Sequence, residues 1–306
     1  MRIFRLKKRN YFFFPFSVII LSSVFMTELS ADDLRRKINF SRPSEPGNVL
    51  FCTVETEAVS TTVLTSADGS KSEKKSTNRM SLEGIMTVKT VTDYGRPATI
   101  EFKVDKVKGE INGQDVKFAS LKKTLGINLE SAPCEFRIKD GKDEIGKNEI
   151  LLLSLVFRKT KRETLSDFIG TDNEVMVGDS WKTPSSPLEN EFAKRGIAPG
   201  DLAISGDVTI ADKGELRGFN CWMFDVKLKA EKGDEFKFEF KAEVFLPDDE
   251  KTGAVKISRF SSEKVVKRIT DKNNPVMPDI KEACITITDK MNLLMLPRRE
   301  NKNEKK

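Results

Sequence analysis

The chain has 306 residues, of which 33% are charged and 38% are apolar, and it contains no histidine. The absence of histidine excludes Ser-His-Asp and Cys-His nucleophilic sites and every histidine-based metal site. Of the 53 basic and 47 acidic residues, five basic residues and one acid lie before Asp32, so 48 and 46 remain after it, a net charge of +2. A nearly neutral body with interleaved charges does not indicate a partner made of nucleic acid.

Residues 1–31 have the pattern of a secretory signal peptide. A basic start precedes an apolar run from Tyr11 to Met26, and Leu29-Ser30-Ala31 offers a cleavage point before Asp32. The run is shorter than the roughly 20 residues of a membrane-spanning helix. The sequence therefore predicts an exported protein, in the periplasm, at the cell surface or outside the cell, with no stable transmembrane anchor after cleavage. An uncleaved N-terminal anchor is the alternative.

The first half of the mature chain has mainly strand patterns. Residues 32–46 are polar and contain proline, which predicts an exposed lead-in. Val49 to Leu64 predicts a long strand, and Ser66 to Asn78 lacks apolar anchors, which predicts a hairpin loop. Met80 to Val91 and Ala98 to Val107 alternate apolar and polar residues, so they predict a second ribbon with one apolar face.

The middle of the chain, from Phe118 to residue 173, departs from this strand pattern. Phe118 to Gly126 predicts a short helix that ends at glycine, and Ala132 to Lys139 predicts a strand. Asn148 to Phe157 predicts a buried helix with Asn148 as its N-cap, and a buried strand is the close alternative. Residues 159–173 are charged and read as a connector between an N-terminal half (32–158) and a C-terminal half (174–296).

The C-terminal half begins with the turn in Val177-Gly178-Asp179-Ser180-Trp181. Ser186-Pro187-Leu188-Glu189 then predicts a helix through a capping box with proline at the first position. Leu202 to Ile210 predicts a strand, and Asp212-Lys213-Gly214 predicts a turn. Further strands are expected at 254–260, 283–288 and 291–296, and residues 297–306 are expected to form a disordered charged tail.

The strongest pattern is the hairpin from Trp222 to Leu246. Even-numbered residues are apolar on both arms, and Gly233-Asp234 lies between them as a turn. Phe236, Phe238 and Phe240 form a comb of aromatic side chains on one face, which other protein or a ligand must cover. These elements predict a mainly β fold of twisted antiparallel sheets, as a curved half-barrel or a sandwich, with two or three short helices and two halves of similar plan.

The four cysteines all lie in the mature chain. An even number of cysteines in an exported protein is typical of disulfides, and Cys52–Cys134 with Cys221–Cys284 is the pairing that we expect. Buried free thiols are the alternative.

Candidates for chemistry are few. A carboxylate-dependent hydrolase would use Asp179 or Asp248-Asp249-Glu250, but aspartates in such turns usually accept backbone hydrogen bonds instead. Trp181 is a candidate aromatic platform for a ligand, with core packing as the alternative, and core packing is expected for Trp222. No cofactor or metal motif occurs in the sequence.

The motif Val177-Gly178-Asp179-Ser180-Trp181 supports a resemblance, together with the apolar run that ends in Val156-Phe157 and the turn at Ile111-Asn112-Gly113. With these features the mature chain resembles a group of exported, β-rich bacterial proteins of uncharacterised function. The resemblance implies a periplasmic or surface protein without known catalytic residues.

The function that we expect is non-catalytic binding outside the cytoplasm. The ligand is an apolar small molecule, held by Trp181, Phe236, Phe238 and Phe240, or else a partner protein of the envelope. A purely structural or interaction module of the envelope is the alternative, and an exported carboxylate-dependent hydrolase ranks below both.

Overall fold

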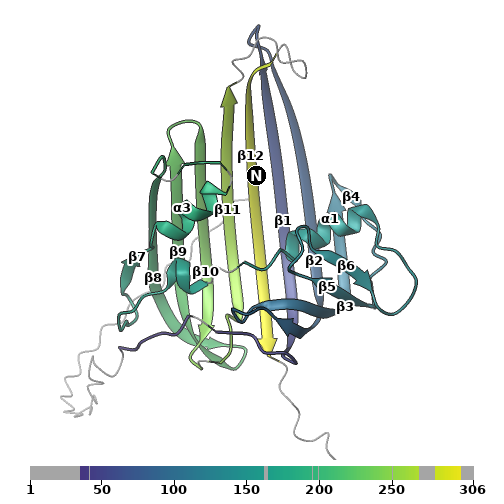
Figure 1. The fold of residues 1–306 in the computed structure, drawn as a ribbon, viewed down its shortest axis with the longest axis vertical. Coiled ribbons are helices and arrows are strands. Elements are labelled where there is room, and N and C mark those ends of the chain that lie inside the picture. Colours follow the sequence, from purple (N-terminus) through teal and green to yellow (C-terminus); the bar gives the residue numbers. More distant parts are fainter. Residues whose placement is uncertain are drawn as a thin grey trace, which may run out of the picture.

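The computed structural model describes residues 35–40, 42–161, 165–194, 196–198, 200–249, 251–268 and 280–297. The predicted signal peptide lies outside the described residues, as does the predicted tail from residue 298 onward. The described chain forms one large antiparallel sheet that is not closed, with short helices on one face (Figure 1). The prediction of a mainly β fold built from antiparallel strands with two or three short helices is confirmed.

The helices are α1 (Lys147–Val156), α2 (Leu165–Ile169) and α3 (Ser186–Ala193). The strands are β1 (Val49–Ser66), β2 (Lys71–Val91), β3 (Pro97–Ile111), β4 (Gln114–Asp115), β5 (Thr124–Asn128), β6 (Glu135–Ile138), β7 (Ser180–Lys182), β8 (Ala203–Leu216), β9 (Phe219–Lys232), β10 (Phe236–Pro247), β11 (Lys256–Arg268) and β12 (Ile280–Pro297).

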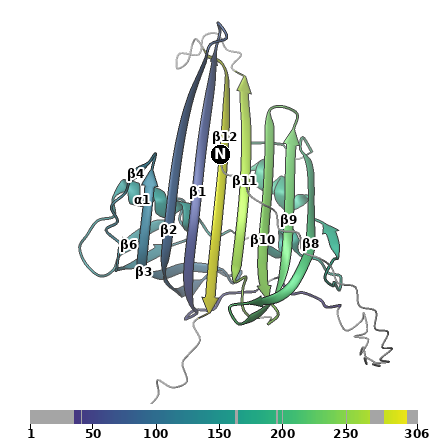
Figure 2. The ribbon, with the colours of Figure 1, turned by 180° about the vertical axis from the view of Figure 1, so that it is seen from behind.

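The strand order shows how the two predicted halves join. The order across the sheet is β6-β5-β3-β2-β1-β12-β11-β10-β9-β8-β7, so each half is a run of neighbouring antiparallel strands. The first strand, β1, pairs with the last, β12, along almost its whole length. The helices lie on the face that Figure 1 presents, here called the inner face, whereas Figure 2 presents the opposite, outer face, on which none of the three described helices lies.

The predicted hairpin forms β9 and β10 in the expected register. Phe238 pairs with Ala230 and Phe240 with Leu228, so the aromatic comb lies on one side of the ribbon. Helix α3 covers that side, and the ring of Phe192 makes edge-to-face contacts with Phe236 at 5.0 Å and Phe238 at 5.3 Å. The requirement that the comb be covered is therefore met by the chain itself.

The N-terminal half has its own core under α1. Leu152 and Leu153 of this helix are fully buried among residues of β1, β2, β3 and β5. Gly109 of β3 permits the close approach, because a Cβ there would lie 2.5 Å from Leu152 Cδ1. The helix predicted over Asn148 to Phe157 is confirmed, but Gly146 takes the N-cap position instead of Asn148.

The lead-in predicted to be exposed is in fact a packed segment, here called the strap (residues 35–40 and 42–48). Phe40 is buried in the C-terminal core, 5.3 Å from the ring of Phe224, and the side chain of Arg42 donates to the carbonyl oxygens of Asp249 and Thr252. Further along the strap, Gly47 donates its N–H to Val88 of β2. The strap therefore contacts both halves of the sheet.

Three other sequence predictions are wrong in detail. Lys71 to Asn78 belongs to β2 instead of a loop, because backbone pairing with β1 stabilises a segment without apolar side chains. Where a helix was predicted over Phe118 to Gly126, residues 119–122 form turns and Thr124 begins the strand β5, in which buried Leu125 and Ile127 alternate with half-buried neighbours. The predicted turn at 212–214 lies within β8, and the chain turns at Arg217-Gly218, where both residues have positive φ.

Candidate functional site

The central strands extend far beyond the helices and form a projecting part of the sheet (Figures 1 and 2). We call this part the blade; it consists of residues 58–66 of β1, 71–77 of β2, 264–268 of β11 and 280–288 of β12. No residue of the blade is buried, and on β1 every residue from Ala58 to Ser66 is half-exposed. Because neighbouring side chains on a strand point to opposite faces, both faces of the blade are open to solvent, except at Val265, which packs against the C-terminal core.

Charge is distributed across the blade in a regular way. Its two central segments, Ala58–Ser66 of β1 and Ala283–Thr288 of β12, contain no charged residue and are rich in threonine, valine and isoleucine. Ile287 on the inner face is 45% exposed, which is high for a large apolar side chain in a central strand. The flanking segments have a net positive charge, with three lysines and one glutamate in residues 71–77 of β2 and three basic residues in 264–268 of β11. An uncharged centre with a charged rim is the usual composition of a protein–protein interface.

An ion cluster around the buried Asp289 lies at the base of the blade on the inner face. Asp289 of β12 accepts hydrogen bonds at Oδ2 from Arg158 and, at 3.3 Å, from Arg259 of β11. Arg158 belongs to the segment that crosses the inner face between β6 and β7, so Asp289 fixes this crossing to the sheet. Burial lowers the pKa of Arg259, and the charge of Arg158 lowers it further. The covered core therefore ends at this cluster and the uncovered blade begins beyond it.

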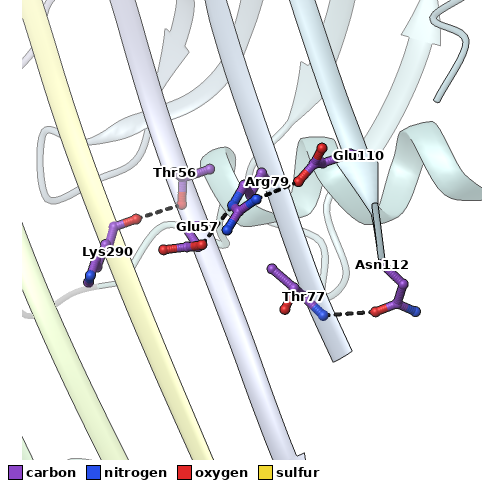
Figure 3. A network of polar contacts seen from close by, with 7 residues as sticks. All are labelled: Thr56, Glu57, Thr77, Arg79, Glu110, Asn112 and Lys290. Atoms are coloured by element: carbon purple, nitrogen blue, oxygen red, sulfur yellow. Dashed lines mark hydrogen bonds and ion pairs between the residues drawn. The ribbon is translucent and has the colours of Figure 1, made fainter. Parts of the chain in front are cut away.

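On the outer face an arginine joins three neighbouring strands, as Figure 3 shows. Arg79 of β2 donates to Glu57 of β1 at 2.7 Å and to Glu110 of β3 at 2.8 Å. The hydrogen bonds to these two carboxylates raise the pKa of Arg79. The same surface has a pocket of about 670 Å³. Arg79 pairs with two of the carboxylates, and Lys108 and Lys290 also line the pocket, so it presents a mixed-charge surface without a dominant sign.

The predicted site residues Asp179 and Trp181 line one pocket of about 570 Å³ at the β7 edge of the sheet. Asp179 accepts the N–H of Met176 at 3.0 Å and lies 3.9 Å from Arg35 of the strap, so it acts as a turn aspartate. The indole N–H of Trp181 donates to the carbonyl oxygen of Ile169 at 3.0 Å. Trp181 also packs edge-to-face on Phe40 and Phe224, which gives it a structural role.

The second predicted group of carboxylates also has structural partners. Asp248 accepts hydrogen bonds from Trp222 Nε1 at 2.7 Å and from Arg36 at 3.2 Å, and it lies 2.9 Å from Lys213 Nζ. Partial burial opposes its ionisation, but Lys213 and Trp222 outweigh that effect and hold the pKa of Asp248 below its usual value. Asp249 accepts the N–H groups of the turn that follows it, and Glu250 lies outside the described residues.

The aromatic comb occupies the interior of the C-terminal half. Phe236 is buried, and Phe238 and Phe240 are half-buried beneath α3. Neither of the two pockets above includes any of the three phenylalanines. Ligand binding by the comb stays a prediction.

The expected disulfides are absent from the structure, in which Cys52, Cys134, Cys221 and Cys284 are all free. For the expected pair Cys221–Cys284, Cys221 pairs with Pro247 at the end of β10, whereas Cys284 pairs with Val266 of β11 beside the start of β10, so the two lie at opposite ends of these strands. Burial raises the pKa of Cys52 to about 12 and that of Cys221 to about 11. The alternative of free thiols, three of them buried, describes the structure.

Comparisons with known proteins give no family. No family model matches the chain, and no curated protein matches it. The crystal structure of the P. putida toluene transporter TodX aligns with 84% of this chain and 93% of its own length, at 6% identity and a TM-score of 0.15. A TM-score this low does not show a common fold. In the ranges that the structure describes, no helix combines the length and apolar character needed to cross a membrane.

Sequence reasoning did not identify the blade. A usable signal exists, because Ala58 to Ser66 is a strand-forming segment that carries no charge on either of its two alternating faces. A strand that is buried on both faces has the same uncharged sequence pattern. Only the position of the helices in the fold distinguishes such a buried strand from the exposed strand seen here.

Proposed function

We propose that this protein is an exported, non-catalytic binding protein whose blade engages a partner protein outside the cytoplasm. The observation that carries the proposal is the two-sided exposure of the blade. A sheet normally packs at least one face against other protein, and here the long central strands continue beyond the last described cover on either face.

The composition of the blade favours a protein over a small ligand. The open surface is a flat sheet of threonine, serine, valine and isoleucine, whereas small molecules are normally held in concave pockets. With strands spaced about 4.8 Å apart and rising about 3.3 Å per residue, each face of the blade measures roughly 480 Å². A stable interface needs about 800 Å² from each partner, so one face alone is too small and the partner must extend around the blade.

The proposal places the protein outside the cytoplasm because of the sequence pattern of residues 1–31. Intact-mass measurement of the protein recovered from the cell envelope or medium tests this part. The expected mature chain begins at Asp32, and a protein that keeps Met1 in the cytoplasm overturns it.

Site-specific photocrosslinking tests the binding surface. A photoreactive amino acid replaces Ile287 in the blade, and the matched control replaces Leu151, which is 46% exposed on α1. Both positions expose a large apolar side chain, but only the first lies in the proposed interface. In intact cells we expect a discrete adduct with one protein from position 287 and none from position 151. Equal labelling from both positions, or no adduct from position 287, overturns the proposal.

A further inference from the structure

One edge of the blade has unpaired backbone groups. The pairing of β2 with β3 begins at Asn78 and Ile111, so the segment of β2 before Asn78 has no described strand on that side. Asn112 hydrogen-bonds both backbone groups of Thr77, the first residue of β2 beyond this pairing. Its backbone N–H donates to the carbonyl oxygen of Thr77 at 2.7 Å, and its side-chain oxygen accepts the N–H of Thr77 at 2.8 Å (Figure 3).

Beyond Thr77 the same edge has no such partner. In an antiparallel strand, alternate residues direct both backbone groups toward the same neighbouring strand. Thr77 directs its groups away from β1, so Lys75, Glu73 and Lys71 do the same. Within the part of the chain that the structure describes, no hydrogen bond reaches the outward groups of these three residues.

We propose that an extended acidic segment of a partner protein adds to this edge of β2 as a further strand, alongside Lys71 to Ser76. The inference rests on the proposed function and specifies how the partner extends around the blade. Strand addition uses the unpaired backbone groups for affinity and the alternating side chains for specificity.

Charge identifies the occupant. Lys71, Lys74 and Lys75 outnumber Glu73 on this edge, and all four side chains are exposed. Lysines on an edge strand disfavour pairing with an identical edge, because two copies would bring their positive charges together. A second copy of this chain is therefore a poorer occupant than an acidic strand. An acidic strand places carboxylates opposite the lysines and gains favourable cross-strand pairs on both faces.

Two substitutions at Glu73 separate strand addition from simple charge attraction. Glu73→Pro and Glu73→Gln both remove the same negative charge, so each makes the edge more basic. Only proline also removes the outward N–H, and it does so on the side away from β1, where an edge strand tolerates it. Circular dichroism and the melting temperature, compared with those of the native chain, verify that both variants fold.

The probe is a fluorescein-labelled synthetic peptide with the repeat Val-Glu-Glu-Thr, which places glutamates on both faces of an added strand, and the matched control peptide has lysine in place of each glutamate. Fluorescence anisotropy at low and physiological salt measures binding to the full mature chain. We expect the acidic peptide to bind and the basic one not to bind. Glu73→Gln should bind the acidic peptide as well as or better than the native chain, and Glu73→Pro should weaken its binding about tenfold.

Tighter binding by both variants indicates charge attraction alone and overturns the inference, as does the absence of any binding by the acidic peptide. Either outcome leaves the photocrosslink from position 287 unaffected, so the failure of edge pairing is distinguishable from the failure of the proposed function. Loss of the crosslink together with retained peptide binding would overturn the proposed function and leave only the pairing at the edge of β2.

Discussion

Truncation of Phe192 to alanine tests how the aromatic comb is covered. The Phe192 side chain is 1% exposed, and its ring lies 5.0 Å from Phe236 and 5.3 Å from Phe238. Removing a buried phenylalanine ring loses its transfer free energy and leaves a cavity, which together cost about 3–5 kcal/mol of unfolding free energy. The smaller change Phe192→Leu keeps most of the contact and should cost less than about 1.5 kcal/mol.

Urea unfolding followed by tryptophan fluorescence measures this cost. Both tryptophans of the chain belong to the C-terminal core, so their emission reports that half of the sheet. Leu151→Ala on the exposed side of α1 is the control and should change the unfolding free energy by less than about 0.5 kcal/mol. A cost below about 1 kcal/mol for Phe192→Ala would show that α3 does not cover the comb, and the reasoning on the C-terminal core would then be wrong.

The same assay tests whether the two cores unfold together. Leu152 is fully buried in the N-terminal core, and its truncation to alanine should cost about 2–5 kcal/mol. Because β1 pairs with β12 and the strap contacts both halves, we expect Leu152→Ala to shift the tryptophan transition as well. A tryptophan transition that stays in place would show that the halves unfold independently.

Three further outcomes are expected. Iodoacetamide should label the native protein at Cys284 alone, since the other three cysteines are buried. Mass spectrometry of the labelled peptides measures this, and a second labelled cysteine would contradict it. Gly84→Ala should lower the unfolding free energy by about 1–3 kcal/mol, because a Cβ there would lie 2.6 Å from Phe102 Cε1. An unchanged urea midpoint would refute the close packing of Gly84 on Phe102 at this β-bulge. The pKa of Asp248 is lower in the folded chain, so its ionised form stabilises the fold above the unfolded pKa of about 4, and this contribution is lost as the pH falls through the folded value. Asp248→Asn should therefore flatten the loss of stability between about pH 4 and pH 2, and a variant with the acid profile of the native chain would refute the role of this carboxylate.

A segment's structure was predictable from the sequence where its side chains follow a clear apolar–polar pattern, and it was missed where they do not. The β9–β10 hairpin was predictable in register, because one buried face imposes an alternation that cannot slip by one residue. Lys71 to Asn78 gave no such signal, since both of its faces meet solvent and only backbone pairing holds it in the sheet. The strap was missed for a related reason, because Ile38 and Phe40 are too few to set a period.

The candidate site was less predictable than the fold. Asp179 and Trp181 do lie in one pocket, as a motif-based interpretation suggests, but both side chains already have structural partners. The ion cluster of Arg158, Arg259 and Asp289 joins three distant segments, and no spacing in the sequence links them. The position of the blade depends on where the helices stop, which is a tertiary property.

The pairing of β1 with β12 has a consequence for biogenesis. During synthesis or translocation the chain emerges from its N-terminus, so β1 waits for its partner until nearly all of the other strands have emerged. The pairing of β1 with β12 at the centre of the sheet is thus the last to form, although β1 is the first strand that the structure describes. Folding dominated by such distant contacts is slow and leaves strand edges open to aggregation in the interval. In a chain arrested before Ile280, the edge of β1 that pairs with β12 would stay exposed. We therefore expect such a chain to bind chaperones that hold unfolded proteins.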